Sequence, residues 1–492
     1  MLLGYLLCIS KYFYLKNKAM KKTIVNWGIA VSLYTYLFYE QIQGYNVIVF
    51  SATLIGLVAH THPALLAQRQ WQKSALVQLI LAFAVAWHGL GWASLMYICS
   101  ILVFIGFTMA PQSTVIGAWL NGFLSAMVVS FLDNFSKIKS GIASLFQPLW
   151  RYQRQRKPSL YVMPFSVTVV FYGLYCWANP DFWLDLAWID VKIDVWLVGF
   201  VLLGGVVLCP LFFAGSGKLP FTETPYHENL TRIKKRTAKT KVGTMALKYE
   251  YRQAVILFFM LNTLITIFLL FSMAQLLLPA LQTTKGFSEQ VHEGFNALLI
   301  SIASAIALIV YFFRGNQNFY ANNRRLLQLA FVWIALNAAL GGFTFYKNTL
   351  YVMAFGLTFK RIWVYIALLL TLGGLVLTYY KIKKVKSTAF LVRQTMWLVY
   401  ATVSCYLLVD WSRLITWYNF TYAERLDMSY IQQLDVTRLP FLQAKLEQND
   451  LRLVMYKLAI EKEIKTQKRW NSTVLDWRSR TLDRDWLRKT LK

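Results

Sequence analysis

The sequence predicts an all-α protein, a polytopic transmembrane bundle that ends in a small helical module. Three observations support this class. Apolar residues make up 57% of the chain and charged residues only 15%, whereas soluble domains carry roughly a quarter charged residues. Runs such as 255–275 and 362–380 contain no charge and are about as long as a helix that crosses the hydrocarbon. The last part of the chain is polar, and its segment 451–464 has apolar residues at the spacing of one helical face.

The net charge of +29 indicates that the chain contacts a negatively charged partner. These residues sit in short loops between the apolar runs, which is the positive-inside pattern of membrane proteins. Anionic lipids on the cytoplasmic face attract such loops. The expected partner is therefore the lipid bilayer with anionic lipids on its cytoplasmic side, and nucleic acid is not expected.

The charges also predict the topology of the N-terminal part. The basic cluster before residue 24 is placed in the cytoplasm, and four spans follow at 24–39, 45–60, 74–88 and 92–109. The next run, 114–132, is interrupted by Gly117, Asn121 and Gly122. If it crossed the membrane, the basic loop after it would lie outside, against the positive-inside rule. Either one earlier span is miscounted or the run is re-entrant or interfacial, and we expect a broken or interfacial helix.

Seven further spans alternate regularly after this point, at 160–178, 196–215, 254–278, 295–313, 326–345, 362–380 and 390–409. The total is about eleven or twelve, by the length a spanning helix needs. The Trp- and Asp-rich segment 179–194 is typical of an interfacial helix. The N-terminus is expected in the cytoplasm and the tail outside. Four regions follow: N-terminal transmembrane helices 1–135, basic cytoplasmic loop 136–159, transmembrane core 160–411 and extracytoplasmic helical tail 412–492.

Motifs for catalysis, metals and cofactors are weak throughout. The five cysteines match no zinc or haem spacing, and His60 with His62 lacks a further ligand nearby. His227 and Glu228 in an inner loop have no visible catalytic partner. Paired glycines lack the spacing of a phosphate loop. We expect no catalytic residue, no metal and no cofactor.

Polar groups at the mouths of the last spans are the better candidates, because charges are costly inside hydrocarbon. The candidate polar cluster consists of Glu293, Thr358, Lys360, Arg361, Asp410, Arg413, Tyr418 and Asn419. The topology places segments 356–361 and 410–419 on the same outer face, so they are expected to touch. Their opposite charges predict an ion pair that clamps the helices and orients the tail, or an anion or lipid-headgroup site on the same cations. Asn262, Asn296 and Asn337 are expected to bond between helices.

Four segments carry a resemblance to a known family. Residues 355–361 (FGLTFKR) are similar to a Y-G-L-T-x-x-R signature, and 410–419 (DWSRLITWYN) to N-P-D-x-x-I-A-R-Y-N. Residues 426–431 (LDMSYI) resemble L-D-x-x-Y-L, and 178–182 (ANPDF) resemble A-D-P-x-F. Over roughly 160–440 the chain thus resembles the uncharacterised bacterial multi-pass family catalogued as domains of unknown function 4153 and 4173. Phe355 replaces its usual tyrosine and Trp417 its usual arginine, so roles of that hydroxyl or that charge do not carry over.

The resemblance implies an integral protein of the bacterial inner membrane and brings no substrate. Of three function classes, we expect a scaffold, signalling or envelope-complex subunit, not an enzyme, that contacts protein partners through its outer tail and basic inner loops. The alternative is a transporter or flippase for a small or lipid-linked anionic solute, although carboxylates inside the apolar runs are scarce. The second alternative is a membrane-embedded enzyme on a lipid-linked substrate, which requires Glu293, Lys360, Arg361 and Asp410 to converge in one pocket.

Overall fold

A computed structural model describes the greater part of the chain. The described residues are 2–89, 91–127, 138–139, 167–168, 171–172, 175, 194–213, 228–230, 244–277, 287–313, 316–320, 322–424, 426–472 and 475–491, without the side chains of 2–19, 244–247, 287–297, 316 and 472. Every named element within these ranges is an α- or 3₁₀-helix, which confirms the all-α class. The chain forms two compact units, Met1–Thr222 with Val474–Leu482 and Glu223–Thr473 with Asp483–Lys492.

The first unit is a helical bundle. Its elements are α1 (Leu2–Phe38), α2 (Tyr45–Thr61), η1 (Pro63–Ala67), α3 (Arg69–His88), α4 (Gly91–Met109), α5 (Val115–Ala126), α9 (Val195–Phe212) and η6 (Trp477–Ser479). Helix α5 packs closely on α4, because Gly106 faces the backbone of Ala118 and Gly122 faces that of Leu102, with no room for a Cβ at either glycine. With 12 residues, α5 is too short to cross a bilayer, in line with the expected interruption of run 114–132.

Three helices of the first unit share a buried polar network. The hydroxyls of Ser51 on α2 and Tyr97 on α4 lie 2.8 Å apart. The amide of Gln78 on α3 donates to Ser51 at 3.4 Å and accepts from Ser100 on α4. Such bonds hold apolar helices together where the hydrophobic effect between them is weak.

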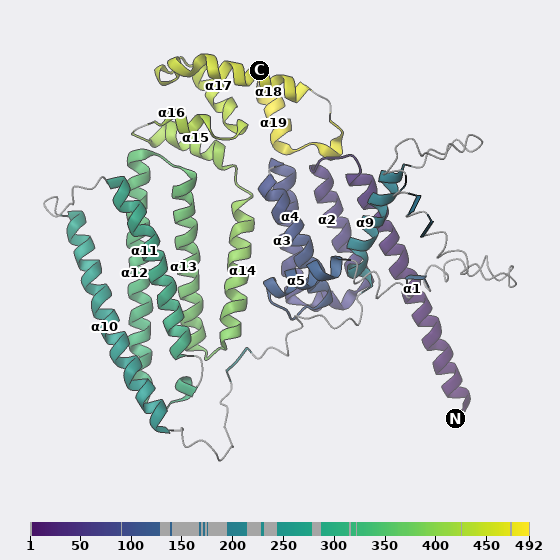
Figure 1. Cartoon of the computed structure of the whole chain (residues 1–492), viewed down its shortest axis with the longest axis horizontal. Coiled ribbons are helices and arrows are strands. Elements are labelled where there is room, and N and C mark those ends of the chain that lie inside the picture. Colours follow the sequence, from purple (N-terminus) through teal and green to yellow (C-terminus); the bar gives the residue numbers. More distant parts are fainter. Residues whose placement is uncertain are drawn as a thin grey trace. The chain divides into compact units, whose positions relative to one another are not determined.

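The second unit begins with five long helices that lie side by side in Figure 1. They are α10 (Thr244–Leu277), α11 (Phe287–Phe312), α12 (Arg324–Phe355), α13 (Phe359–Lys383) and α14 (Thr388–Tyr406), with η3 (Asn316–Phe319) between α11 and α12. Phe258, Ile309 and Leu375 pack in the shared core of α10, α11, α12 and α13. Phe259 and Leu264 remain 63% exposed on the outer face of α10, as expected of a helix that faces lipid.

Two of the three asparagines expected to bond between helices have described side chains. Asn262 on α10 donates to the carbonyl of Leu329 on α12 at 3.0 Å, which confirms the expected bond. Asn337 donates within its own helix, to the carbonyl of Trp333 at 2.8 Å. The side chain of Asn296 lies outside the described residues.

Five helices among the described residues are long and apolar enough to cross a membrane: Gly91–Met109, Val195–Phe212, Lys248–Gln275, Arg324–Phe355 and Phe359–Lys383. Helices α14 and α15 (Trp411–Tyr422) would form a sixth span, bent by 68° at the break between them. Tyr45–Thr61, Val115–Ala126 and Leu298–Phe312 are shorter apolar helices. The total of eleven or twelve spans stays a prediction.

The C-terminal module follows α14. It consists of α15, α16 (Met428–Gln432), η4 (Val436–Arg438), α17 (Leu439–Glu447), η5 (Leu451–Tyr456), α18 (Lys457–Ser472) and α19 (Leu482–Thr490). Ile431, Leu439 and Leu453 form its core, each with 0% of its surface exposed. Arg438 is buried as well, and its guanidinium donates to both carboxylate oxygens of Glu463 at 2.8 Å.

The apolar residues of 451–464 do not share one face, and the single helical face expected from the sequence is wrong. Leu453 and Ile460 lie in the core, while Leu451 and Leu458 are 85% and 83% exposed. Residues 451–456 form a 3₁₀-helix, with 3.0 residues per turn rather than 3.6. In such a turn residues three positions apart share a side, so Leu451 and Val454 face outward together while Leu453 faces the core.

Candidate functional site

The connection between α12 and α13 is a tight corner at residues 356–358. Gly356 has φ 81° and ψ 176°, a backbone conformation that is essentially restricted to glycine. A Cβ at this position would lie 2.7 Å from Oδ1 of Asn419 and 3.0 Å from its Cγ. Both the backbone conformation and the space around it therefore require glycine.

Asn419 of α15 holds the backbone of this corner. The N–H of Leu357 donates to Oδ1 of Asn419 at 2.5 Å, and Nδ2 of Asn419 donates to the carbonyl of Leu357 at 3.0 Å. The amide thus satisfies both backbone groups of Leu357, as a neighbouring β-strand would. This pair confirms the expected contact between segments 356–361 and 410–419.

Arg361 closes the end of α12. Its Nη1 donates to the carbonyl of Phe355 at 2.8 Å and to that of Gly356, and its guanidinium carbon lies 4.2 Å from the ring centre of Tyr351. The last carbonyls of a helix have no partner within the helix, so a cation at this point is doubly favourable. Arg361 therefore caps the C-terminal end of α12, in place of the expected ion pair with Asp410.

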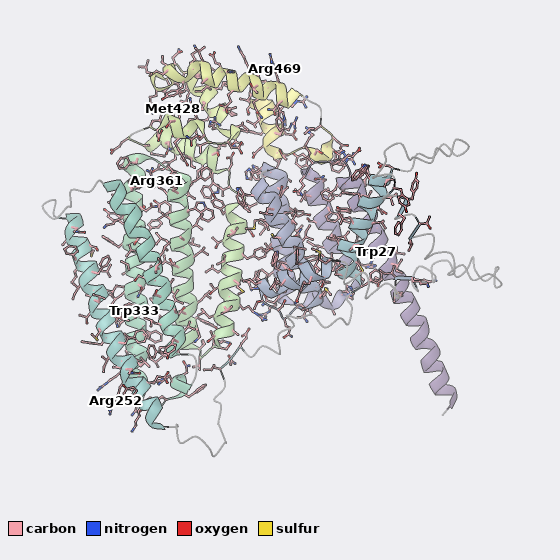
Figure 2. The ribbon with its side chains drawn as sticks, in the orientation of Figure 1. Trp27, Arg252, Trp333, Arg361, Met428 and Arg469 are labelled. Carbon is pink, nitrogen blue, oxygen red and sulfur yellow. The ribbon has the colours of Figure 1, made fainter. Side chains whose placement is uncertain are left out.

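The first turn of α13 is capped from two sides. The hydroxyl of Thr358 accepts from the N–H of Arg361 at 3.4 Å. The N–H of Phe359 donates to the hydroxyl of Tyr430 on α16 at 2.8 Å. Irregular backbone at a membrane boundary must find such partners, because an unpaired peptide group there is costly. We call Gly356, Leu357, Thr358, Arg361, Asn419 and Tyr430 the corner cluster. Figure 2 labels Arg361 of this cluster and Met428 at the start of α16.

Asp427 stands next to the corner cluster. Its carboxylate accepts from the hydroxyl of Ser429 at 2.6 Å and from the N–H of Tyr430 at 3.1 Å. These hydrogen bonds, with a smaller contribution from the charge of Arg361, lower the pKa of Asp427. Gly356, Asp427 and Tyr430 were absent from the predicted cluster, although all three lie within the quoted motifs. Tyr418 packs in the apolar cluster of Leu357 and Ile415.

The other predicted residues lie elsewhere. Lys360 is exposed. Glu293 belongs to α11, and its side chain lies outside the described residues. His227 is also outside them, whereas Glu228 pairs with Lys386 at 3.2 Å. In the first unit, Nε2 of His62 lies 3.1 Å from the carbonyl of Phe212.

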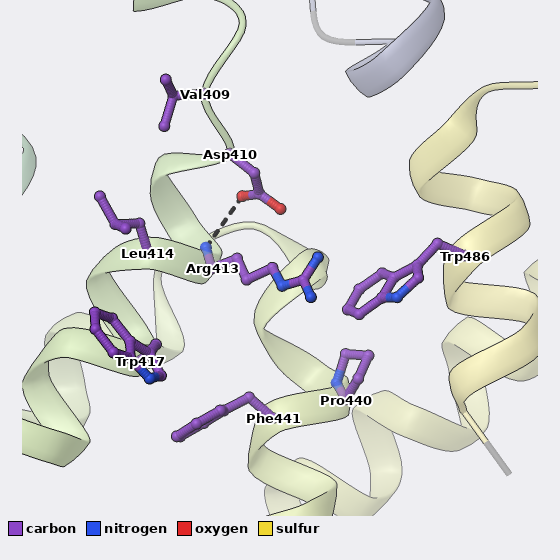
Figure 3. A pocket seen from close by; sticks show the side chains of 8 residues that line it. All are labelled: Val409, Asp410, Arg413, Leu414, Trp417, Pro440, Phe441 and Trp486. Carbon is purple, nitrogen blue, oxygen red and sulfur yellow. Dashed lines mark hydrogen bonds between the residues drawn. The ribbon is translucent and has the colours of Figure 1, made fainter.

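Asp410 and Arg413 take part in a second arrangement at the start of α15. Asp410 caps this helix by accepting from the N–H of Arg413 at 3.0 Å, and it also accepts from the hydroxyl of Thr437 at 3.0 Å. The guanidinium of Arg413 lies over the ring of Trp486 on α19, 4.2 Å from the ring centre. Asp410, Arg413 and Trp486 line a hollow of about 530 Å³, and Figure 3 shows its lining side chains. We call it the α15 hollow; its lining residues are Val409, Asp410, Arg413, Leu414, Trp417, Pro440, Phe441 and Trp486.

The enzyme hypothesis requires four residues to converge in one pocket, and the structure places the described ones apart. Arg361 belongs to the corner cluster, Asp410 lines the α15 hollow, and Lys360 is exposed. These three side chains therefore do not share a pocket. Within the described part of the chain, no three His, Cys, Asp or Glu side chains gather where a metal ion could bind.

The apolar helices and their hydrogen-bonded corner define a helical membrane protein. The family described as Domain of unknown function (DUF4153) matches residues 75–444. This is more than half of the chain, so the protein belongs to that family. The match begins well before residue 160, where the resemblance of the motifs started. No curated protein and no solved structure matches the chain.

The family motifs acquire a physical role in the corner cluster. The first motif supplies Gly356 and Arg361, the second Asn419, and the third Tyr430. Together they complete the hydrogen bonds of one backbone corner. The A-D-P-x-F resemblance at 178–182 lies outside the described residues.

Proposed function

We propose that the protein is a non-enzymatic docking subunit of the bacterial inner membrane, with its N-terminus in the cytoplasm and its C-terminal module outside. The module would bind a protein partner of an envelope complex. The observation that supports this function is an exposed apolar stripe on η5 and α18. Basic inner loops and the family membership support the location.

The stripe consists of four large side chains: Leu451, Val454, Met455 and Leu458. They are exposed by 85%, 63%, 92% and 83%, and their spacing is i, i+3, i+4 and i+7. Helices that insert into a hydrophobic groove of another protein commonly carry anchors at this spacing. Large apolar side chains grouped on a surface mark interaction sites more often than scattered ones do.

The chemistry around the stripe indicates the kind of partner. Lys457, Lys462 and Lys465 are exposed on α18, while two nearby acids are already paired, Asp450 with Arg452 and Glu463 with Arg438. An apolar stripe beside exposed lysines fits a partner that has an apolar groove with carboxylates at its rim. The corner cluster and the core of the module keep this surface in a fixed position on the long helices of the second unit.

Site-specific photocrosslinking in native membranes tests the proposal. A photoreactive residue at Met455 should give a discrete protein adduct, which disappears when Leu451 and Leu458 are both replaced by serine. Lys468→Ser, at an exposed position on the same helix, is the matched control and should retain the adduct. A lipid adduct alone, a cross-linked dimer of the chain, or an adduct unaffected by the double variant would each contradict a docking function for this stripe.

A second candidate function, transport, is favoured by polar atoms inside the second unit. Oδ1 of Asn262, Oδ1 of Asn337 and Nε1 of Trp333 are buried without a hydrogen-bond partner among the residues that the structure describes. Such atoms are costly in an apolar interior, and a solute or water path would satisfy them. In a cysteine-free background, Asn337→Cys should then react with a small thiol reagent, and buried Leu340→Cys should not. Equal protection of both positions excludes a path at Asn337.

A further inference from the structure

We propose that the α15 hollow binds an amphipathic monoanion, meaning a molecule with one acidic head group and a hydrocarbon chain. This site is separate from the docking stripe and does not depend on it. Its position supports lipid-like chemistry, because Val409 and α15 directly follow the last apolar helix, at the 68° bend. Head groups and chains of membrane amphiphiles meet at this level of a bilayer.

Arg413 is the anion-binding group. Its guanidinium carbon lies 4.2 Å from the ring centre of Trp486, and no N–H of this guanidinium donates to an acceptor among the described residues. Arg361 and Arg438, in contrast, donate to carbonyl or carboxylate oxygens. A cation–π contact holds a guanidinium in place while its N–H donors remain available for a two-pronged bond to phosphate or carboxylate. Figure 3 shows this guanidinium between Asp410 and Trp486, at the edge of the hollow.

The walls of the hollow select a hydrocarbon chain. Leu414, Trp417 and Val409 are 38%, 44% and 39% exposed, and Phe441 with Pro440 forms the opposite side (Figure 3). Six of the eight lining residues carry no charge, so a sugar or a nucleotide would lose its hydrogen bonds to water without replacement. The volume of about 530 Å³ is typical of small-molecule pockets.

Asp410 limits the charge of the head group. Its carboxylate lies in the same hollow and accepts from the backbone N–H of Arg413 and the hydroxyl of Thr437, both at 3.0 Å. A carboxylate beside the binding cation repels a polyanion more than a single negative charge. A phosphodiester lipid and a free fatty acid both have the required chemistry, one acidic group and an acyl chain.

The test uses the full chain, purified in an uncharged detergent. Three photoactivatable probes are compared: a phosphatidylglycerol, a palmitic acid and the methyl ester of that palmitic acid. Adducts are mapped by mass spectrometry. One or both acidic probes should label the peptide that contains Val409, Leu414 and Trp417, and the ester should label it at least about tenfold less, since a charged hydrogen bond is lost. Labelling by only one acidic probe identifies the source of the ligand.

Arg413→Gln should reduce the labelling by acidic probes about tenfold or more and leave the weak labelling by the ester unchanged. Lys360→Gln removes another exposed cation and should have no effect. Arg413→Lys keeps the charge but not the planar guanidinium. Its labelling by acidic probes should fall between that of Arg413→Gln and that of Lys360→Gln. Equal labelling by acid and ester, adducts on other peptides, or full labelling of the Arg413→Gln variant would overturn the proposal. If that variant does not fold, the comparison of acid with ester on the unaltered protein decides the question.

Discussion

Replacement of Asn419 tests the corner cluster most directly. In Asn419→Ala, the N–H and the carbonyl of Leu357 both lose their partner. Both hydrogen bonds are buried, and a buried unsatisfied group costs about 1–3 kcal/mol. The two together predict a loss of roughly 3 kcal/mol, if water relieves part of the cost. For a unit of this size, each kcal/mol lowers the melting temperature by about 2–4 °C, so we expect a decrease of about 6–12 °C.

Thermal unfolding of the purified protein in detergent measures this effect. Thr421→Ala is the control, because Thr421 lies on the same helix, is exposed and bonds only to its own helix, at the carbonyl of Trp417. Asn419→Asp adds a sharper comparison. An aspartate keeps the acceptor for Leu357 N–H but places a second oxygen against the Leu357 carbonyl, so it should be at least as destabilising as alanine. A melting temperature of Asn419→Ala within about 1 °C of Thr421→Ala, well below the shift per kcal/mol, would refute this account of the corner.

Three further predictions concern stability. Gly356→Ala forces φ 81° on a residue with a Cβ that would collide with Asn419, so the melting temperature should fall by the equivalent of about 1–3 kcal/mol; no fall would mean that the corner relaxes freely. Glu463→Gln leaves the buried Arg438 without its carboxylate, which should cost about 3 kcal/mol and speed proteolysis of the module, with Glu447→Gln as the exposed control. The side chain of Arg452 lowers the pKa of Asp450 to about 2; because this folded-state pKa lies below the unfolded value of about 3.9, the associated stability is present above pH 4 and is lost as the pH falls toward 2. Melting curves between pH 5 and 2.5 should therefore show a smaller acid-induced decrease for Asp450→Asn, and an unchanged decrease would contradict this.

Composition and charge alternation were enough to predict the helical class and the contact between two segments about sixty residues apart. The partner of Arg361 was not predictable in the same way. The expected span ended at residue 345, but α12 continues to Phe355. This extension brings the last carbonyls of the helix to Arg361. A boundary error of a few turns therefore changed a predicted ion pair into a helix cap.

The exposed stripe was also beyond sequence reasoning. Leu451, Val454 and Leu458 share one side of a helix, and Leu453 lies on the other side. The spacing alone does not say which side is buried, and in the structure Leu453 enters the core while the others face outward. The bond between Phe359 and Tyr430 depends on the path of the chain after α15, which no local pattern encodes.

The bond from Asn419 to Leu357 has a consequence for dissecting the molecule. A fragment that stops after α14 would retain the five long helices of the second unit. It would lack Asn419, which bonds to the N–H and carbonyl of Leu357, and Tyr430, which accepts from the N–H of Phe359. The smallest fragment that can fold as this bundle should therefore extend at least to Tyr430, well past the end of α14. The tail is then not an appendage that can be swapped between relatives at the end of the membrane part. Grafts should join after α16, where the hydrogen bonds of the corner cluster are already complete.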